Sequence, residues 1–163
     1  MARILIIGGG TRGLALTRGL CEDGHAVRVT TRTDARRAAI EAAGGECFVG
    51  TPDRLATLRP ALEGVTIACW LLGRATGDEE QIRALHGSRL EFFLTQIIDS
   101  TVRGFVYEAC RGALEESILT AGLDAVLAIT SRNSIPLAFI EEDPTDEQGW
   151  LTAAQAAIAS LLA

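Results

Sequence analysis

The sequence contains no lysine, so all 15 of its positively charged side chains are arginines. This absence excludes every mechanism that needs a lysine amine, including Schiff-base chemistry and a tyrosine whose pKa is lowered by a neighbouring lysine. Histidine is also scarce: His25 and His86 are the two present, and neither has a second histidine or a carboxylate at metal-ligand spacing. We therefore expect turn or surface histidines and no metal site.

Long hydrophobic runs are missing as well. No segment reaches the roughly 20 apolar residues that cross a membrane, and the apolar stretch near the N-terminus is too short for a signal peptide. The net charge of −6 disfavours nucleic acid and anionic membranes as partners, because both attract clustered cations. These features predict a cytoplasmic protein that binds any anionic ligand locally.

The four cysteines are scattered singly, without C-x-x-C spacing, and each lies in or beside an apolar segment. They are Cys21, Cys47, Cys69 and Cys110. We expect buried, reduced thiols. A length of 163 residues allows one domain with a sizeable core but not a dinucleotide domain plus a full substrate domain, so residues 1–163 are predicted to form a single domain.

The most informative stretch is an apolar run, residues 3–7, that breaks into glycines. Gly8, Gly10 and Gly13 have the spacing G-x-G-x-x-G, in which the first glycine permits a tight turn, the second lets the backbone approach a pyrophosphate, and the third packs helix against strand. The helix that follows would direct its free N–H groups at the phosphates. This pattern predicts dinucleotide binding, with a glycine-rich turn that binds nothing as the alternative.

The second predicted strand, residues 26–31, ends where an NAD site usually offers an acidic side chain to the ribose. The sequence has Thr31-Arg32-Thr33 there. An arginine at this point can hold a 2′-phosphate, and Arg12 in the glycine loop is placed to make a second contact, so NADP is favoured over NAD. Asp34 keeps NAD open as the alternative, and both arginines could simply be solvated.

Apolar periodicity and turn residues predict alternating strands and helices along the whole chain. The predicted strands are 3–7, 26–31, 46–49, 65–72, 105–109 and 124–129, and the predicted helices are 13–23, 34–43, 52–62, 78–101, 112–121 and 146–163. Gly87 marks a possible break in the longest helix, and residues 131–143 are expected to be irregular, with a short extended piece at 136–140. The alternation indicates an α/β fold: a doubly wound parallel sheet with strand order 3-2-1-4-5-6, helices on both faces and a ligand at the carboxyl edge.

The sequence resembles the atypical short-chain dehydrogenase/reductases, in particular shortened NmrA-like and epimerase-like NAD(P)-binding Rossmann proteins. The motifs that carry the resemblance are residues 4–13, 24–28 leading to Arg32, 62–65, 102–107 and 116–124. The resemblance implies cofactor phosphates at Gly8, Gly10, Thr11 and Gly13, a 2′-phosphate at Arg12 and Arg32, adenine near Thr51, and nicotinamide-side contacts near Leu72 and Gly73. Thr31, next to Arg32, is also expected among the cofactor-binding residues. The family often has aspartate at the position of Thr51.

The sequence departs from the family at its catalytic dyad. Family enzymes carry Tyr-x-x-x-Lys on a helix, where the lysine lowers the pKa of the tyrosine and holds the ribose. Tyr107 and Arg111 reproduce the spacing, but Tyr107 falls inside a predicted strand, where residues four apart are separated by roughly 13 Å. We therefore expect a core tyrosine with a bonded hydroxyl, and we assign no catalytic residue.

Three functions are compatible with these features. The favoured one is a binding or redox-sensing protein that holds NADP, or alternatively NAD, without turning it over. The second is an NADP-dependent oxidoreductase or epimerase-like enzyme with a proton donor other than the dyad, and the third is an interaction module that no longer binds a ligand.

The helix predicted at 78–101 has more apolar surface than one sheet face can cover, because Phe92 and Phe93 are adjacent and point about 100° apart. In the family this helix pairs with its two-fold mate, so we expect a homodimer through it. The alternative is that the C-terminal helix covers Phe92 in the same chain. Trp70 is expected in the core or a pocket wall, Trp150 over the cleft or at a subunit contact, and the acidic residues between 141 and 147 in a solvated loop.

Overall fold

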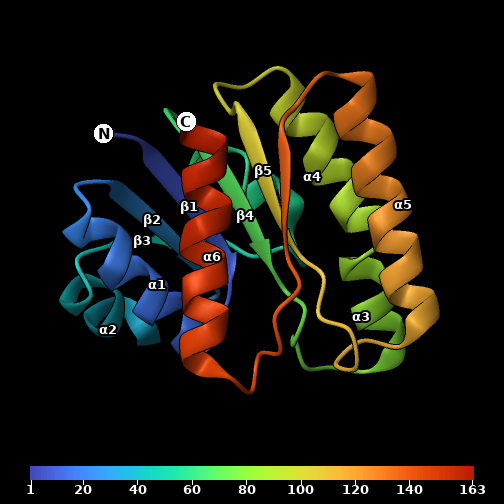
Figure 1. Cartoon of the computed structure of the whole chain (residues 1–163), viewed down its shortest axis with the longest axis horizontal. Coiled ribbons are helices and arrows are strands. Elements are labelled where there is room, and N and C mark those ends of the chain that lie inside the picture. The colour runs from blue at the N-terminus through green and yellow to red at the C-terminus, as the bar shows by residue number, and fades with distance from the viewer.

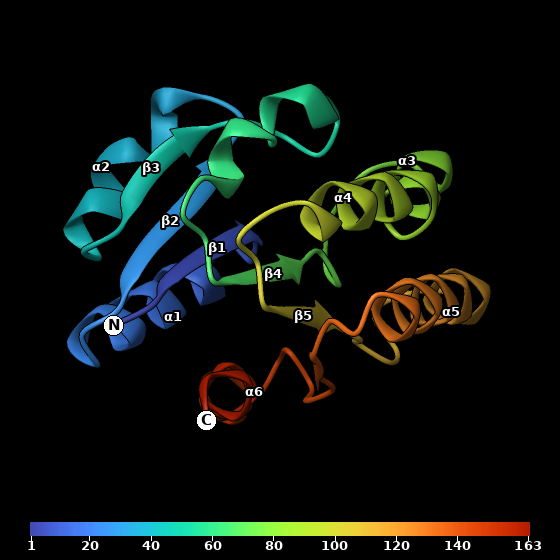
Figure 2. The ribbon, with the colours of Figure 1, turned by 90° about the horizontal axis from the view of Figure 1, so that it is seen from above.

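The structure is a computed structural model that describes all of residues 1–163. A six-stranded parallel sheet lies between two layers of helices (Figures 1 and 2). Its strands are β1 (Arg3–Gly8), β2 (Ala26–Thr31), β3 (Glu46–Val49), β4 (Ile67–Leu71), β5 (Gly104–Glu108) and β6 (Leu137–Ile140). Their order in the sheet is β3-β2-β1-β4-β5-β6, which confirms the predicted doubly wound fold.

Helices cover both faces of the sheet. They are α1 (Gly10–Glu22), α2 (Arg37–Ala42), α3 (Glu79–Leu85), α4 (Ser88–Ile98), α5 (Glu116–Arg132) and α6 (Glu147–Leu162), with short 3₁₀ turns at 34–36, 55–57 and 60–62. The helices α1, α2 and α6 lie on one face, and α3, α4 and α5 lie on the other (Figure 2). None of the helices is both long and apolar enough to span a bilayer.

Strand β1 shows how the sequence builds two cores. Successive side chains of a strand point to opposite faces, and all four apolar residues at the centre of β1 are fully buried. Ile4 and Ile6 join the core under α1 and α6, whereas Leu5 and Ile7 join the core under α4 and α5. An unbroken apolar run is what a central parallel strand requires, because it has no solvated face.

The predicted strand at 124–129 is wrong, and so is the predicted end of the preceding helix at Gly122. Residues 116–132 form one helix, α5, and the sixth strand is the extended piece at 137–140. The buried positions of α5 recur every four residues, at Ile118, Gly122, Val126 and Thr130. Gly122 permits close packing rather than ending the helix, because a Cβ there would overlap the hydroxyl oxygen of Tyr107.

The predicted helix at 52–62 is also wrong: the segment forms a turn and two 3₁₀ turns. Pro60 cannot donate the backbone hydrogen bond that a helix would need at this point. The Thr57 hydroxyl competes as well, because it accepts a hydrogen bond from Thr51 N at 2.9 Å and donates to Arg54 O at 2.6 Å.

The helix predicted at 78–101 is divided at Gly87 into α3 and α4, as its glycine suggested. The core holds this break in place, since Trp70 Nε1 donates to Leu85 O at 3.1 Å. His86, at the end of α3, is fully buried, which corrects the expectation of a turn or surface histidine. His25 does lie in a turn, before β2, where its Nδ1 accepts from Ala2 N at 3.2 Å.

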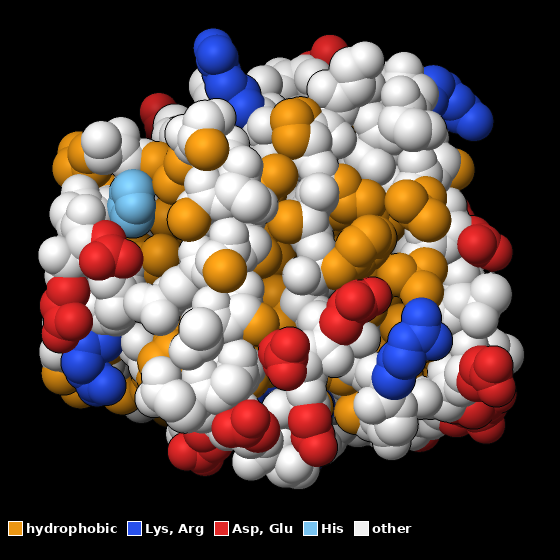
Figure 3. All heavy atoms as spheres, in the orientation of Figure 1, with side chains coloured by type: hydrophobic (Ala, Val, Ile, Leu, Met, Phe, Trp, Pro, Cys, Tyr) orange, Lys and Arg blue, Asp and Glu red, His pale blue; other side chains and the backbone are white.

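The C-terminal helix α6 packs beside α1 and β6, on the face opposite α4 (Figure 2). It therefore does not cover Phe92, which is 51% exposed, while Phe93 is fully buried against Trp70. Trp150 is fully buried in the core, which corrects its expected place over the cleft or at a subunit contact. Figure 3 shows acidic side chains along the lower edge of this face, where the solvated loop at 141–147 lies.

Candidate functional site

A cleft of about 620 Å³ opens at the carboxyl edge of the sheet, where β1, β2 and β4 end. This volume is in the range of small-molecule sites, roughly 300–1,000 Å³. Eight of the ten residues predicted to bind the cofactor line it: Gly8, Gly10, Thr11, Arg12, Thr31, Arg32, Thr51 and Leu72. The other two do not line it: Gly13 packs against Gly8, and Gly73 packs against Glu108.

The glycine loop forms the floor of the cleft by close backbone packing. Gly8 has φ +85°, and a Cβ there would lie 2.5 Å from Leu71 O, so the turn requires glycine. A Cβ at Gly13 would lie 3.0 Å from Gly8 O, which places helix α1 directly against the turn. These are the packing roles that the glycine spacing predicted for the first and third glycines.

Gly10 provides the open face of the loop. It has φ +54°, and a Cβ there would meet nothing within 4 Å, so the cleft leaves room in front of this backbone. Helix α1 begins at Gly10, and no side chain caps its N-terminus. The first N–H groups of a helix have no partner within the helix, and they carry its positive dipole end. The loop therefore fits a pyrophosphate.

The β2 end of the cleft carries two arginines. Arg32 is 71% exposed, and its Nη2 pairs with Asp53 Oδ2 at 2.8 Å. Arg36, which the sequence analysis did not select, lines the cleft and donates from Nη2 to Gly10 O at 3.1 Å. Exposed ion pairs such as Arg32–Asp53 contribute only about 0–1 kcal/mol, so a phosphate can replace the carboxylate. This end can accept a second anionic group.

Asp34, on which the alternative prediction of NAD rested, does not line the cleft. Its Oδ1 accepts two hydrogen bonds from Arg37, at 3.0 and 2.7 Å. Thr51 does line the cleft, and its hydroxyl accepts from Asp53 N at 3.2 Å within a tight turn.

Arg12 is directed differently from what the sequence suggested. Its Nη1 pairs with Glu108 Oε2 at 2.6 Å, its guanidinium stacks 4.6 Å from the Trp150 ring, and its side chain is only 12% exposed. Glu108 is fully buried. Leaving a buried carboxylate unpaired costs about 3–5 kcal/mol, whereas a charged hydrogen bond to phosphate returns about 1.5–3 kcal/mol. Arg12 is therefore held by Glu108, and Arg36 is better placed to assist Arg32.

The β4 end of the cleft is formed by Leu72 and the exposed Arg74, which flank Gly73. Glu108 Oε1 accepts from Gly73 N at 2.8 Å. His86 Nε2 lies 3.0 Å from Leu72 O, and because a carbonyl can only accept, this nitrogen carries the imidazole proton. The core thus fixes both backbone groups that border this end.

A thiol and a phenol near this end, those of Cys110 and Tyr107, both have raised pKa values and stay protonated at neutral pH. Burial first, and the charge of Glu108 second, raises the pKa of the Cys110 thiol to about 12. Burial likewise raises the pKa of the fully buried Tyr107 well above its usual value. A thiol or phenol in this state is a poor nucleophile or base. Tyr107 lies in β5 with a bonded hydroxyl, as predicted, and α5 contains neither tyrosine nor lysine.

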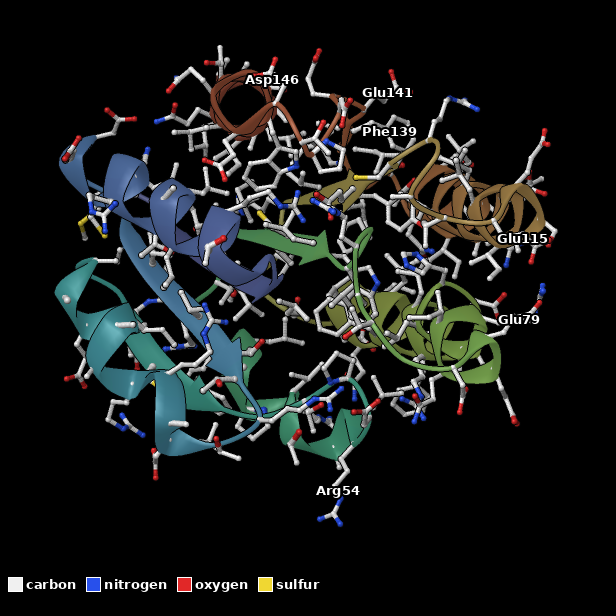
Figure 4. The ribbon with its side chains drawn as sticks, turned by 90° about the horizontal axis from the view of Figure 1, so that it is seen from below. Arg54, Glu79, Glu115, Phe139, Glu141 and Asp146 are labelled. Carbon is white, nitrogen blue, oxygen red and sulfur yellow. The ribbon has the colours of Figure 1, made fainter.

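Four residues of the cleft region were not predicted from the sequence: Arg36, Asp53, Arg74 and Glu108. Arg36 could have been found as the second basic residue after β2. Glu108 carries a clearer signal, because it is a charged residue that ends the apolar strand β5 at the edge where parallel sheets bind ligands. Arg54 makes a useful contrast: it is exposed and points into solvent away from the protein (Figure 4).

No protein-family model matches the sequence, and neither does any curated protein. Solved structures do match. Vestitone reductase from alfalfa (Medicago sativa) aligns with a TM-score of 0.64 and 18% identity, covering 86% of this chain and 56% of its own. UDP-glucuronic acid 4-epimerase from Bacillus cereus, in complex with UDP-glucuronic acid and NAD, aligns at 0.64 and 12% identity, covering 85% and 55%.

Triphenylmethane reductase from Citrobacter sp., complexed with NADP(H), aligns with a TM-score of 0.65 and 17% identity, covering 86% of this chain and 49% of its own. The chain thus spans about half the length of these proteins. At such low identity the likeness concerns the fold. The chain therefore has the same Rossmann fold as these two reductases and this epimerase.

Proposed function

We propose that this chain binds NADP, with NAD as the weaker ligand, and acts as a binding or redox-sensing protein. It would not use the Tyr-x-x-x-Lys dyad of the short-chain dehydrogenase/reductases that it resembles. The observation that carries the proposal is the pairing of an open glycine loop at Gly10 with Arg32 and Arg36 at the end of β2. The loop suits a pyrophosphate and the arginines suit a 2′-phosphate. Asp34, the acidic alternative, is paired with Arg37 outside the cleft.

The absence of turnover is supported by the residues of α5 and β5. Helix α5 offers no tyrosine or lysine, Tyr107 is buried, and the pKa of Cys110 is high. The alternative is an NADP-dependent oxidoreductase or epimerase-like enzyme with another proton donor. It is favoured by the reductases and the epimerase among the structural matches.

Two measurements test the proposal. Titration calorimetry with NADP⁺ and NAD⁺ is expected to give tighter binding of NADP⁺. Incubation with NADPH and a panel of carbonyl compounds is expected to give no oxidation of NADPH. Turnover that disappears in Arg32→Ala would establish the enzyme alternative, and binding of neither dinucleotide would contradict the proposal as a whole.

We also propose that a second copy of this chain packs on α4 and α5. Phe92 on α4 is 51% exposed and Leu127 on α5 is 49% exposed, and these two helices pack against each other on the same sheet face. The exposed Ala121 and Ala128 of α5 are small enough for a helix to approach closely. A two-fold contact would bury these apolar side chains against their own copies.

A further inference from the structure

Glu108 is a fully buried carboxylate that receives hydrogen bonds from three separate segments. Oε2 accepts from Arg12 Nη1 in the first turn of α1 at 2.6 Å and from Trp150 Nε1 in α6 at 2.7 Å. Oε1 accepts from Gly73 N, after β4, at 2.8 Å. Both oxygens are thus engaged, which a buried charge requires.

Two of these three partners belong to the walls of the cleft. Arg12 lines it directly, and Gly73 lies between Leu72 and Arg74, which both line it. Trp150 does not line the cleft. Arg12 and Gly73 follow β1 and β4, which are neighbours in the sheet, so Glu108 joins two walls at the end of the cleft away from Arg32.

We propose that Glu108 is a positioning residue for dinucleotide binding, which sets the distance between the first turn of α1 and the turn after β4. This inference rests on the proposed function. The fit is tight, because a Cβ at Gly73 would lie 2.9 Å from Glu108 Oε1, so the backbone packs directly on the carboxylate. Without the carboxylate, the Arg12 charge and the Gly73 N–H lose their partners, and the two walls can separate.

Glutamine at this position cannot replace glutamate. Its side chain offers one acceptor oxygen and an NH₂ group, whereas three donors converge on two oxygens here. Either Gly73 N or the Arg12 and Trp150 donors would face the NH₂ group. The resulting movement affects the half of the cleft that would take the pyrophosphate and the nicotinamide. It is expected to spare Arg32, which follows β2 on the other side of β1 and pairs with Asp53 rather than with α1.

The test compares a whole ligand with a fragment. Affinities for NADP⁺ and for 2′-AMP, which reaches only the Arg32 end, are measured by calorimetry for the wild type and Glu108→Gln. We expect Glu108→Gln to bind NADP⁺ about tenfold more weakly and 2′-AMP within about twofold of wild type.

Trp150→Phe is the matched control. It removes the third hydrogen bond to Glu108 but keeps an aromatic ring for the Arg12 guanidinium to stack on. We expect it to lower the thermal unfolding midpoint while leaving both affinities unchanged. If Glu108→Gln weakens both ligands alike, or if Trp150→Phe weakens NADP⁺ binding equally, Glu108 only stabilises the fold and the inference is wrong.

If Glu108→Gln does not fold, Gly73→Ala provides a second test of the same contact. The added Cβ displaces the turn while Glu108 keeps its charge, and we expect the same selective loss of NADP⁺ affinity. Unchanged NADP⁺ affinity in a folded Gly73→Ala would overturn the positioning role. A wild-type protein that binds neither NADP⁺ nor NAD⁺ contradicts the proposed function itself. Equal, tight binding by wild type and Glu108→Gln contradicts only the role of Glu108.

Discussion

His86 Nδ1 accepts a hydrogen bond of 2.6 Å from the hydroxyl of Tyr107, and both residues are fully buried. The direction of this bond follows from the other ring nitrogen, which donates its proton to Leu72 O. A neutral imidazole satisfies both contacts, since Nε2 donates to Leu72 O and Nδ1 accepts from Tyr107. Burial is the largest cause that lowers the pKa of His86 below its usual value.

This arrangement predicts acid-sensitive stability. As the pH falls below about 6.5, the unfolded chain binds a proton at His86 more readily than the folded protein does, so the free energy of unfolding decreases. Above that pH this residue contributes no pH dependence. We expect the thermal midpoint of the wild type to fall between pH values of about 6.5 and 5, and His86→Gln to lose this part of the dependence.

The carboxylates with shifted pKa values titrate at lower pH than His86, so their effect on stability can be separated from that of the imidazole. Glu115 and Asp143 have pKa values lowered mainly by hydrogen bonds from Ser117 and Thr145, and they lose their contributions only at more acidic pH, below about 4.5. Parallel midpoint curves for wild type and His86→Gln above that pH would show that the imidazole does not set the acid limit.

A second prediction concerns Gly10, where a substitution can act through backbone strain or through its position in the cleft. Gly10→Ala adds a Cβ in open space at φ +54°, where a non-glycine residue costs about 1–2 kcal/mol. We expect a modest loss of stability and a loss of NADP⁺ affinity of at least about tenfold, because the methyl group would occupy the space that the proposed function assigns to the pyrophosphate. Gly24→Ala is the matched control, with φ +91° and equally open space outside the cleft. Equal affinities of the two variants for NADP⁺ would place the phosphates elsewhere.

A third prediction concerns the choice between the dinucleotides. Arg32→Ala and Arg36→Ala are each expected to weaken NADP⁺ binding by roughly 10- to 100-fold, the value of one charged hydrogen bond, and to change NAD⁺ binding by less than about threefold. Arg54→Ala removes an equally charged side chain that points away from the cleft (Figure 4), and it is expected to change neither affinity. Equal losses for NADP⁺ and NAD⁺ in Arg32→Ala would mean that this arginine does not contact a 2′-phosphate.

A fourth prediction tests the second copy on α4 and α5. Sedimentation at micromolar concentration is expected to show a dimer that Phe92→Glu dissociates without loss of NADP⁺ affinity, since Phe92 does not line the cleft. Phe93 is unsuitable for this test because it is fully buried. Val49→Glu, at an apolar side chain of similar exposure at the end of β3, is the control and is expected to remain dimeric. A wild-type protein that stays monomeric contradicts the proposal.

The sequence by itself determined the features that depend on neighbouring residues. The run at 3–7 and the glycines after it predicted β1, the tight turn and a helix directly after it, because these depend on local backbone geometry; α1 begins at Gly10, three residues before the predicted start. The alternation of segments predicted the order of the sheet, since right-handed crossovers leave few arrangements. Arg32 was found for the same reason, because its place follows directly from the end of β2.

Tertiary structure decided what depends on partners distant in the chain. Arg12 and Glu108 are 96 positions apart, and nothing local to Arg12 indicates that a buried carboxylate holds it. The burial of His86 and Trp150 is likewise set by Tyr107 and Glu108 on β5. Segment 124–129 has the apolar residues that a strand would need. It is helical because it continues α5, whose period of four buries Gly122 and Val126. Local preference is weak beside such packing, so these outcomes emerge only when the segments meet.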